Sequence, residues 1–437
     1  MQKKYHAKLF KNLSKLLTNT DFVKHYCFNQ KHFTRERKLT FRIITLLILR
    51  LLKSSVKTEL KSFYTTVHKV DEVINWVSDA AFCKARQKIK HQLFIDLYKF
   101  VVRFFYGHIG GKRWFHFRLL AVDGSELNLP SSPELLKQYG CHHTNSIGTE
   151  IPNARVSFLY DALNFITLDA QIESFKIGEQ RMFEDHLSDI GKGDLLTADA
   201  NYGHFRILKE IKKHKSEFCI RMSKSSKFVK DFLASAEKDS VLVWYPSRNT
   251  IENCKKHNVD FSLLKIRLVR IDLSENETEV LAISLLDQNI YSYNHIKELY
   301  DKRWGVEEEI KKYMQRLMIE FFSSIKVNGV LQDFYANVFM LNIVSFLAKP
   351  VEEQIHESSK HCKFRQQINW TSAIGDVRER LVLLFLRGVG KVNSILKSMW
   401  DSFKINTDAI KPGRKFPRDK RKKGSRRKAF INYKPAW

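Results

Sequence analysis

The sequence predicts an α/β protein in which a mixed sheet is flanked by helical N-terminal and C-terminal regions. Three observations lead to this prediction. Two short apolar runs, 118–122 and 194–198, each lead into an aspartate and a turn, which is typical of buried strands. The stretch 215–290 holds further strand-like runs. The stretches on either side of the sheet, 1–110 and 330–402, have the apolar patterning of helices.

The first 110 residues are predicted to form a helical DNA-binding region (1–110). Apolar residues recur there at spacings of three and four, and the stretch contains no proline. Lysine and arginine are interleaved with aromatic residues, as in 31–38, which suits contact with nucleic acid. A helical packing or oligomerisation domain explains this stretch equally well when it is taken alone.

The middle of the chain is predicted to build the sheet. One strand ends at Asp123 with a turn at Gly124, and a second ends at Asp199 with a turn after it. The other elements expected here are a loop at 130–153, a strand pair at 154–160 and 165–173, helices at 178–190 and 204–214, and strands at 218–222, 241–245, 263–273 and 278–286. A helix over 294–317 follows, then a helical region at 331–410 and a disordered or extended basic tail at 411–437.

The charge of the chain favours a polyanionic partner. Its 437 residues suggest two or three domains, and 75 Lys and Arg against 47 Asp and Glu give a net charge of +28. Such an excess suits nucleic acid first and an acidic membrane surface second. The tail 411–437 holds 12 Lys and Arg against one Asp, and would bind phosphates without reading sequence; the rest of the chain is basic as well.

The cysteines and apolar runs favour a cytoplasmic protein. The six cysteines have no paired spacing, so we expect reduced thiols and no structural zinc. No secretory leader is visible, and the apolar run 39–52 contains Arg42 and Arg50 and is too short to span a bilayer. We therefore expect no membrane partner.

One stretch of the predicted helix 294–317 brings three chemically useful side chains to one face. At about 100° per residue, Tyr300, Arg303 and Glu307 lie at about 0°, 300° and 340°. A carboxylate that binds a divalent cation, beside a cation that grips phosphate, suits phosphodiester chemistry. A solvated, charged helix with one aromatic anchor is the alternative.

Asp123, Asp199 and Glu307 are the candidate catalytic acids. A mixed sheet with a helix laid across it can bring them together, and three carboxylates can hold two Mg²⁺ ions about 4 Å apart. Other acids compete for this role. Asp161 is expected to cap a turn, and Glu126 to support the site from outside it, whereas Asp169, Glu308 and Glu309 have no assigned part.

These motifs resemble the bacterial insertion-sequence transposases of the DDE class, in the branch marked by Tyr-x2-Arg-x3-Glu-x6-Lys. The matching residues are Tyr300, Arg303 and Glu307, with Trp304 after the arginine. The stretch 122–125 resembles the strand of the first aspartate, and 198–203 resembles that of the second. Sequences of this family are also resembled by the stretches 82–89, 159–164 and 178–181, with His186.

The resemblance implies an RNase H-like catalytic core over 115–330 with a β-rich insertion at about 215–290. It also implies metal-dependent cleavage at transposon ends and joining to target DNA, with two Mg²⁺ ions (Mn²⁺ as a substitute) on Asp123, Asp199 and Glu307. Tyr300 and Arg303 would contact the DNA end. The partners implied are the terminal inverted repeats, target DNA and a second copy of the chain, because transposases of this class usually act as dimers on paired ends. The region 331–410 is a candidate for the dimer contact.

One departure from the family pattern lies at Met314, where the signature lysine is expected. A thioether cannot bind phosphate. Lys311 lies about 40° round an α-helix from Glu307 and can replace the missing cation, whereas Arg316 faces away. The alternatives to an active transposase are a catalytically decayed copy that only binds DNA and a host nuclease on the same core.

Overall fold

The computed structural model describes residues 3–35, 37–68, 77–144, 150–235, 237–274, 277–302 and 310–411. The chain divides into two compact units. Unit 1 comprises residues 1–110, 127–154 and 312–437, and unit 2 comprises residues 111–126 and 155–311.

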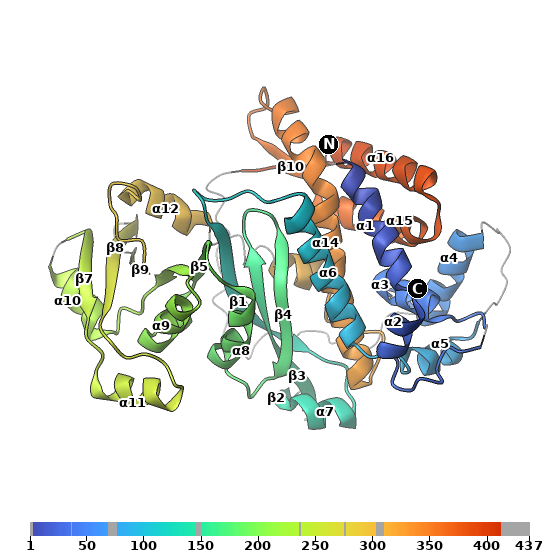
Figure 1. The fold of residues 1–437 in the computed structure, drawn as a ribbon, viewed down its shortest axis with the longest axis horizontal. Coiled ribbons are helices and arrows are strands. Elements are labelled where there is room, and N and C mark those ends of the chain that lie inside the picture. The colour runs from blue at the N-terminus through green and yellow to red at the C-terminus, as the bar shows by residue number, and fades with distance from the viewer. Residues whose placement is uncertain are drawn as a thin grey trace. The chain divides into compact units, whose positions relative to one another are not determined.

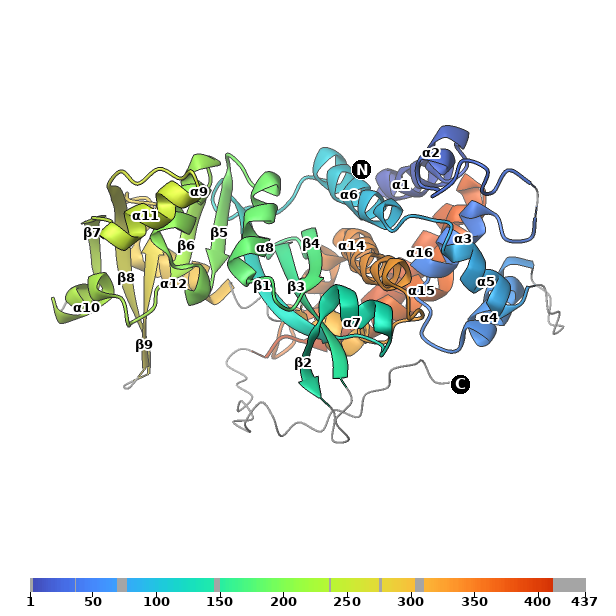
Figure 2. The ribbon, with the colours of Figure 1, turned by 90° about the horizontal axis from the view of Figure 1, so that it is seen from below.

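Unit 1 is mainly helical (Figures 1 and 2). Its helices are α1 (Lys3–Leu16), α2 (Thr20–His25), α3 (Phe41–Leu49), α4 (Val56–His68), α5 (Asp79–Arg86), α6 (Gln92–His108), α7 (Pro133–Tyr139), α14 (Val327–Ser358), α15 (Trp370–Leu386) and α16 (Val389–Ile405). A π-helical turn covers Lys312–Arg316, and the short strands are β2 (Cys141–Thr144), β10 (Gln366–Ile368) and β11 (Thr407–Ala409).

Helix α14 forms the core of unit 1, with α1, α6, α15 and α16 around it in both views (Figures 1 and 2). The His6 ring contacts the Phe346 carbonyl at 3.0 Å, and the Trp400 indole N–H donates to the Leu347 carbonyl at 2.9 Å. This helix is long and apolar enough to cross a membrane, but 94% of that apolar stretch is buried inside the chain. A core helix of a folded protein has the same length and composition.

Unit 2 holds most of a nine-stranded mixed sheet, in the order β2-β3-β1-β5-β6-β9-β8-β7, with β4 also paired to β3. The strands are β1 (Arg118–Asn128), β3 (Glu150–Asp161), β4 (Ile166–Ser174), β5 (Asp194–Ala198), β6 (Glu217–Arg221), β7 (Asp239–Trp244), β8 (Leu264–Ser274) and β9 (Glu277–Ile283). The helices are α8 (Glu179–His186), α9 (Phe205–Lys213), α10 (Lys227–Ala234), α11 (Arg248–Lys256) and α12 (Tyr293–Lys302), with short 3₁₀ turns at Leu187–Asp189 and Ala200–Tyr202.

The α/β class with a mixed sheet is confirmed. Numbered in chain order, the first five strands of the unit 2 core are β1, β3, β4, β5 and β6. Across the sheet they lie in the order β4, β3, β1, β5, β6, which is third, second, first, fourth and fifth in the chain. Strands β1, β5 and β6 are parallel, and helices α8 and α9 follow β4 and β5 and lie against the sheet (Figure 1). This order of strands and helices is that of an RNase H-like core. Strands β9, β8 and β7 extend the sheet antiparallel to β6.

Three local predictions were wrong. Strand β1 continues through Asp123 and Gly124 to Asn128, because β3 pairs with both parts of it: Ala162 N–H donates to Leu119 O, and Leu129 N–H donates to Pro152 O. The expected loop 130–153 contains α7, which Ser132 caps, and β2. The backbone of 312–316 is π-helical, so the α-helical phase does not apply there.

Candidate active site

Two of the three predicted acids belong to neighbouring parallel strands: Asp123 lies within β1, and Asp199 follows the last residue of β5. Strand β1 pairs with β5 from Arg118 opposite Asp194 to Ala121 opposite Thr197. The same register places Asp123 opposite Asp199, two residues beyond the last of these pairs. Since parallel strands lie about 4.8 Å apart, this extension of the register sets the backbones of the two aspartates next to each other.

Local hydrogen bonds fix both carboxylates. The Asp123 carboxylate accepts from Gly124 N–H at 2.8 Å. The Asp199 carboxylate accepts from Asn201 N–H at 2.9 Å and so caps the 3₁₀ turn Ala200–Tyr202. Both side chains are partly exposed. The motif that follows Asp199 therefore serves to orient that carboxylate.

A third acid near Asp123 is Glu179, the first residue of α8. A Cβ atom placed on Gly124 would lie 3.4 Å from Cγ of Glu179 and 3.2 Å from the Val156 carbonyl oxygen. Glycine at 124 therefore lets Glu179 approach β1. The Glu179 carboxylate also accepts from the Asn201 side chain at 3.2 Å, which links it to the turn after Asp199.

A buried network holds α8 against the sheet. The Ser157 hydroxyl lies 2.9 Å from Nε2 of His186, and the Asp169 carboxylate lies 2.7 Å from Nδ1 of the same ring. Serine, histidine and aspartate in this order resemble a nucleophile and its base, but Ser157 and His186 are completely buried, so no substrate reaches them. The network instead anchors the helix that presents Glu179.

Tyr202 has an unpaired hydroxyl that is influenced by the charges of these acids. Its side chain is 1% exposed, and among the described residues its hydroxyl has no hydrogen-bond partner. Burial raises the pKa of Tyr202 well above its usual value, and the negative charges of Glu179, Asp123 and Asp199 raise it further, against the opposing charge of Arg155. The hydroxyl therefore lies within the field of all three acids.

Tyr202→Phe is expected to raise the free energy of unfolding by about 1 kcal/mol in metal-free buffer, because it removes a buried hydroxyl that lacks a partner. Urea unfolding followed by circular dichroism measures this. Tyr26→Phe is the matched control and should lower stability by about 1 kcal/mol, because the Tyr26 hydroxyl donates to Asp96. A loss of stability in Tyr202→Phe would contradict an unpaired hydroxyl.

The third predicted acid, Glu307, lies outside the described residues, as does Arg303. Among the residues that the structure describes, no group of three or more His, Cys, Asp or Glu is arranged to hold a metal ion. The structure thus brings Asp123 and Asp199 together and does not place Glu307.

Tyr300 is buried in the core of unit 2. It is 2% exposed and packs in a cluster with Trp114, Val269 and Ile296. Its hydroxyl donates to the Glu279 carboxylate, which also pairs with Arg221 at 2.8 Å. Contact with DNA would require Tyr300 to leave Glu279, so its predicted role in DNA binding stays a prediction.

The other residues that the sequence singled out lie in different parts of the structure. Lys311 is exposed, and Met314 is half-buried in the π-helical turn. Asp161 is buried and accepts from the backbone N–H groups of Leu163 and Asn164, which confirms that it caps a turn. Glu126 lies 3.6 Å from Arg155, one of the charges that act on Tyr202.

Comparison with known proteins identifies the family. The family model described as "Transposase DDE domain" matches residues 114–343, and this region contains Asp123, Asp199 and Glu307. No curated protein matches the chain. A solved structure, the cryo-EM structure of piggyBac transposase synaptic complex with hairpin DNA, is 11% identical with a TM-score of 0.44, covering 92% of this chain and 81% of that chain. Because the family model covers more than half of the sequence, the chain belongs to the family of transposases with a DDE domain.

Proposed function

We propose that this chain cleaves the ends of a bacterial insertion sequence and transfers the cut strands into target DNA, in a metal-dependent cut-and-paste reaction. The observation that carries the proposal is the pairing of β1 with β5, whose register sets Asp123 opposite Asp199. Membership of the DDE transposase family supports an enzyme that acts on DNA. We assign the chain to the branch with the Tyr-Arg-Glu-Lys signature on Tyr300, Arg303 and Glu307.

The metal ligands in this proposal are Asp123, Asp199 and Glu307. Carboxylate oxygens suit Mg²⁺, with Mn²⁺ as a substitute, and the unpaired Tyr202 hydroxyl beside the acids supplies a further polar group. Two bound ions would activate the attacking oxygen and stabilise the departing one. The pairing of β1 with β5 supports a close approach of the two aspartates, and the network around His186 anchors α8, which carries Glu179.

The other regions are proposed to handle DNA and assembly. Residues 1–110 would bind DNA, and 331–410 would support a homodimer that pairs the two inverted repeats. Arg303, Lys311 and Tyr300 would grip the DNA end. The basic tail 411–437, of which 412–437 lie outside the described residues, would bind phosphates. A DNA-acting transposase of this kind belongs in the cytoplasm, here at the bacterial nucleoid.

A cleavage assay tests the proposal. Purified protein is incubated with duplex DNA that carries the flanking inverted repeats, with Mg²⁺ or with EDTA, beside Glu307→Ala. Glu308→Ala is the matched control, because it removes the neighbouring acid. We expect nicks at the repeat ends that need Mg²⁺, are lost in Glu307→Ala and persist in Glu308→Ala.

Two other results of the cleavage assay would contradict the proposal, and each would favour a different function. Binding without nicks would favour a catalytically decayed copy, which the methionine at position 314 supports, and Met314→Lys would then be the first reversion to test. Nicks that appear on any duplex, regardless of repeats, would favour a general nuclease.

A further inference from the structure

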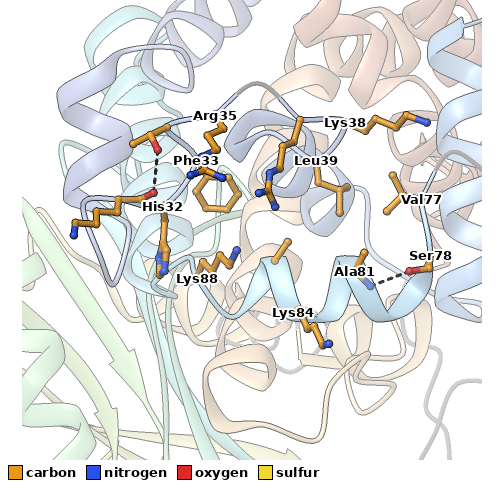
Figure 3. A pocket seen from close by; sticks show the side chains of 14 residues that line it. His32, Phe33, Arg35, Lys38, Leu39, Val77, Ser78, Ala81, Lys84 and Lys88 are labelled. Carbon is orange, nitrogen blue, oxygen red and sulfur yellow. Dashed lines mark hydrogen bonds between the residues drawn. The ribbon is translucent and has the colours of Figure 1, made fainter.

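A cavity in unit 1, remote in sequence from the catalytic acids, is lined by cations. Its volume is about 730 Å³, and it lies between residues 31–35 and 37–39 on one side and helix α5 with the residues next to it on the other (Figure 3). The cationic lining side chains are Lys31, Arg35, Arg37, Lys38, Lys84 and Lys88. Among the described lining residues none is acidic. We call it the basic cavity.

Three cations of the basic cavity have no carboxylate partner in the described part of the chain. Arg35, Arg37 and Lys88 form no ion pair there with any described carboxylate, and Arg35 and Arg37 are exposed. The acid on the first turn of α5, Asp79, accepts from Ala80 N–H and does not line the cavity. Like charges held together repel one another, and a bound anion would offset that cost.

The loop is built in a way that favours a binding site. Phe33 has φ +59°, a left-handed conformation that costs an aromatic residue about 1–3 kcal/mol. Its ring packs edge-on against Phe41 at 5.9 Å and forms part of the cavity wall, opposite α5 in Figure 3. His32 also lines the cavity, and its buried Nδ1 atom has no partner among the described residues. A strained turn beside an unpaired polar atom suits a site completed by a ligand.

The opposite wall is rigid. Helix α5 begins at its cap Ser78, whose hydroxyl accepts from Ala81 N–H at 3.2 Å, and both residues line the cavity. Near the end of the helix, the buried Arg86 guanidinium pairs with Asp333 at 2.9 Å. Lys84 and Lys88 therefore extend from a fixed scaffold, so their ammonium groups meet a ligand at little cost in backbone entropy.

From these observations we propose that the basic cavity binds the phosphate backbone of DNA, as a contact site separate from the acids that cut it. It rests on the proposed function, because the DNA is taken to be the substrate of the transposase. The site holds phosphates through charge and does not read bases, so it contributes to affinity on any sequence.

Duplex binding by the full chain tests this site. The probe is a short DNA duplex of unrelated sequence, titrated at several salt concentrations without Mg²⁺. The test variant is Arg35→Gln/Arg37→Gln/Lys88→Gln. Its matched control is Lys11→Gln/Lys57→Gln/Lys61→Gln, which removes three exposed cations elsewhere in unit 1. Arg35→Gln/Arg37→Gln and Lys88→Gln, tested separately, show whether both walls contribute, and circular dichroism checks folding.

The test variant should bind at least about 10-fold more weakly at 0.15 M salt, and the slope of log K against log salt should fall by about 2–3, because each phosphate contact contributes about 0.9. The control should stay within about twofold of the unchanged chain. Equal losses of affinity in the test variant and the control would overturn the proposed role of the basic cavity. So would tight binding of inorganic phosphate at the cavity if the test variant bound duplex DNA as well as the unchanged chain. If cleavage at the repeats persists in that case, the proposed function stands without this site. If the unchanged chain binds no duplex at all, both the DNA-binding role of the basic cavity and the proposed function are contradicted.

Discussion

Asp123→Asn or Asp199→Asn is expected to lower the rate of DNA nicking at least about 1,000-fold, which corresponds to about 4 kcal/mol of transition-state stabilisation. Each change replaces one of two carboxylates with a neutral amide, and the register of β1 and β5 sets these two residues opposite each other. A metal ion held by carboxylates loses much of its affinity when one becomes a neutral amide. Duplex binding should stay within about twofold, because the phosphate contacts that we propose are made by cations elsewhere.

A thermal shift separates loss of metal from loss of fold. Mg²⁺ should raise the melting temperature of the unchanged chain, because a ligand that binds only the folded state stabilises it, and this rise should vanish in both variants. Asp185→Asn is the control, since Asp185 is an exposed acid on α8 that pairs only with Arg181 among described partners. Nicking that survives in Asp123→Asn or Asp199→Asn would remove that residue from the site.

The strand of the second aspartate could be predicted because its signal is local. Residues 194–198 are an apolar run that is buried along its whole length, as expected of a central parallel strand. The strand of the first aspartate was predicted to end too early. Gly124 and Ser125 indicate a turn in sequence, but the neighbouring strand β3 supplies hydrogen bonds along the continuation of β1. Pairing between distant strands decides such an end, and a local pattern cannot show it.

The candidate site was only partly accessible from the sequence. Asp123 and Asp199 were singled out by position and by family resemblance, whereas their common register appears only when the strands pair. Glu179 lies near Asp123 because Gly124 has no side chain and a buried histidine anchors α8. No spacing in the sequence signals either contact. The unpaired hydroxyl of Tyr202 was missed for the same reason, since burial depends on the fold.

Helical periodicity could not predict the surroundings of Tyr300. The α-helical phase placed its side chain on one face with Arg303 and Glu307, in a role that contacts DNA. The structure buries this side chain against the sheet, where its hydroxyl donates to Glu279. A helix of unit 2 must cover its apolar neighbours, and an aromatic side chain is well suited to this. Periodicity predicts which side chains share a face of a helix, but it does not predict what that face contacts.

The largest expected effect on stability comes from Arg86→Met, which should lower the free energy of unfolding by about 3–5 kcal/mol. Arg86 is 1% exposed and ties α5 to the start of α14. Its guanidinium donates to Gln332 at 2.9 Å, to Ser323 at 2.7 Å and to Asp333 at 2.9 Å. Methionine keeps much of the volume but leaves the Asp333 carboxylate buried without its cation. Urea unfolding followed by circular dichroism measures the loss.

Lys360→Met is the matched control, because Lys360 and Glu357 form an ion pair at 2.7 Å whose side chains are 71% and 70% exposed. Solvent screens such a pair, so its loss should cost less than about 1 kcal/mol. The double change Arg86→Met/Asp333→Leu should recover part of the stability, because no buried charge then lacks a partner. A loss below about 1 kcal/mol in Arg86→Met would show that Asp333 finds water or another donor. Because α5 carries one wall of the basic cavity, a loosened α5 should also weaken duplex binding, which links this buried pair to the surface that we propose holds DNA.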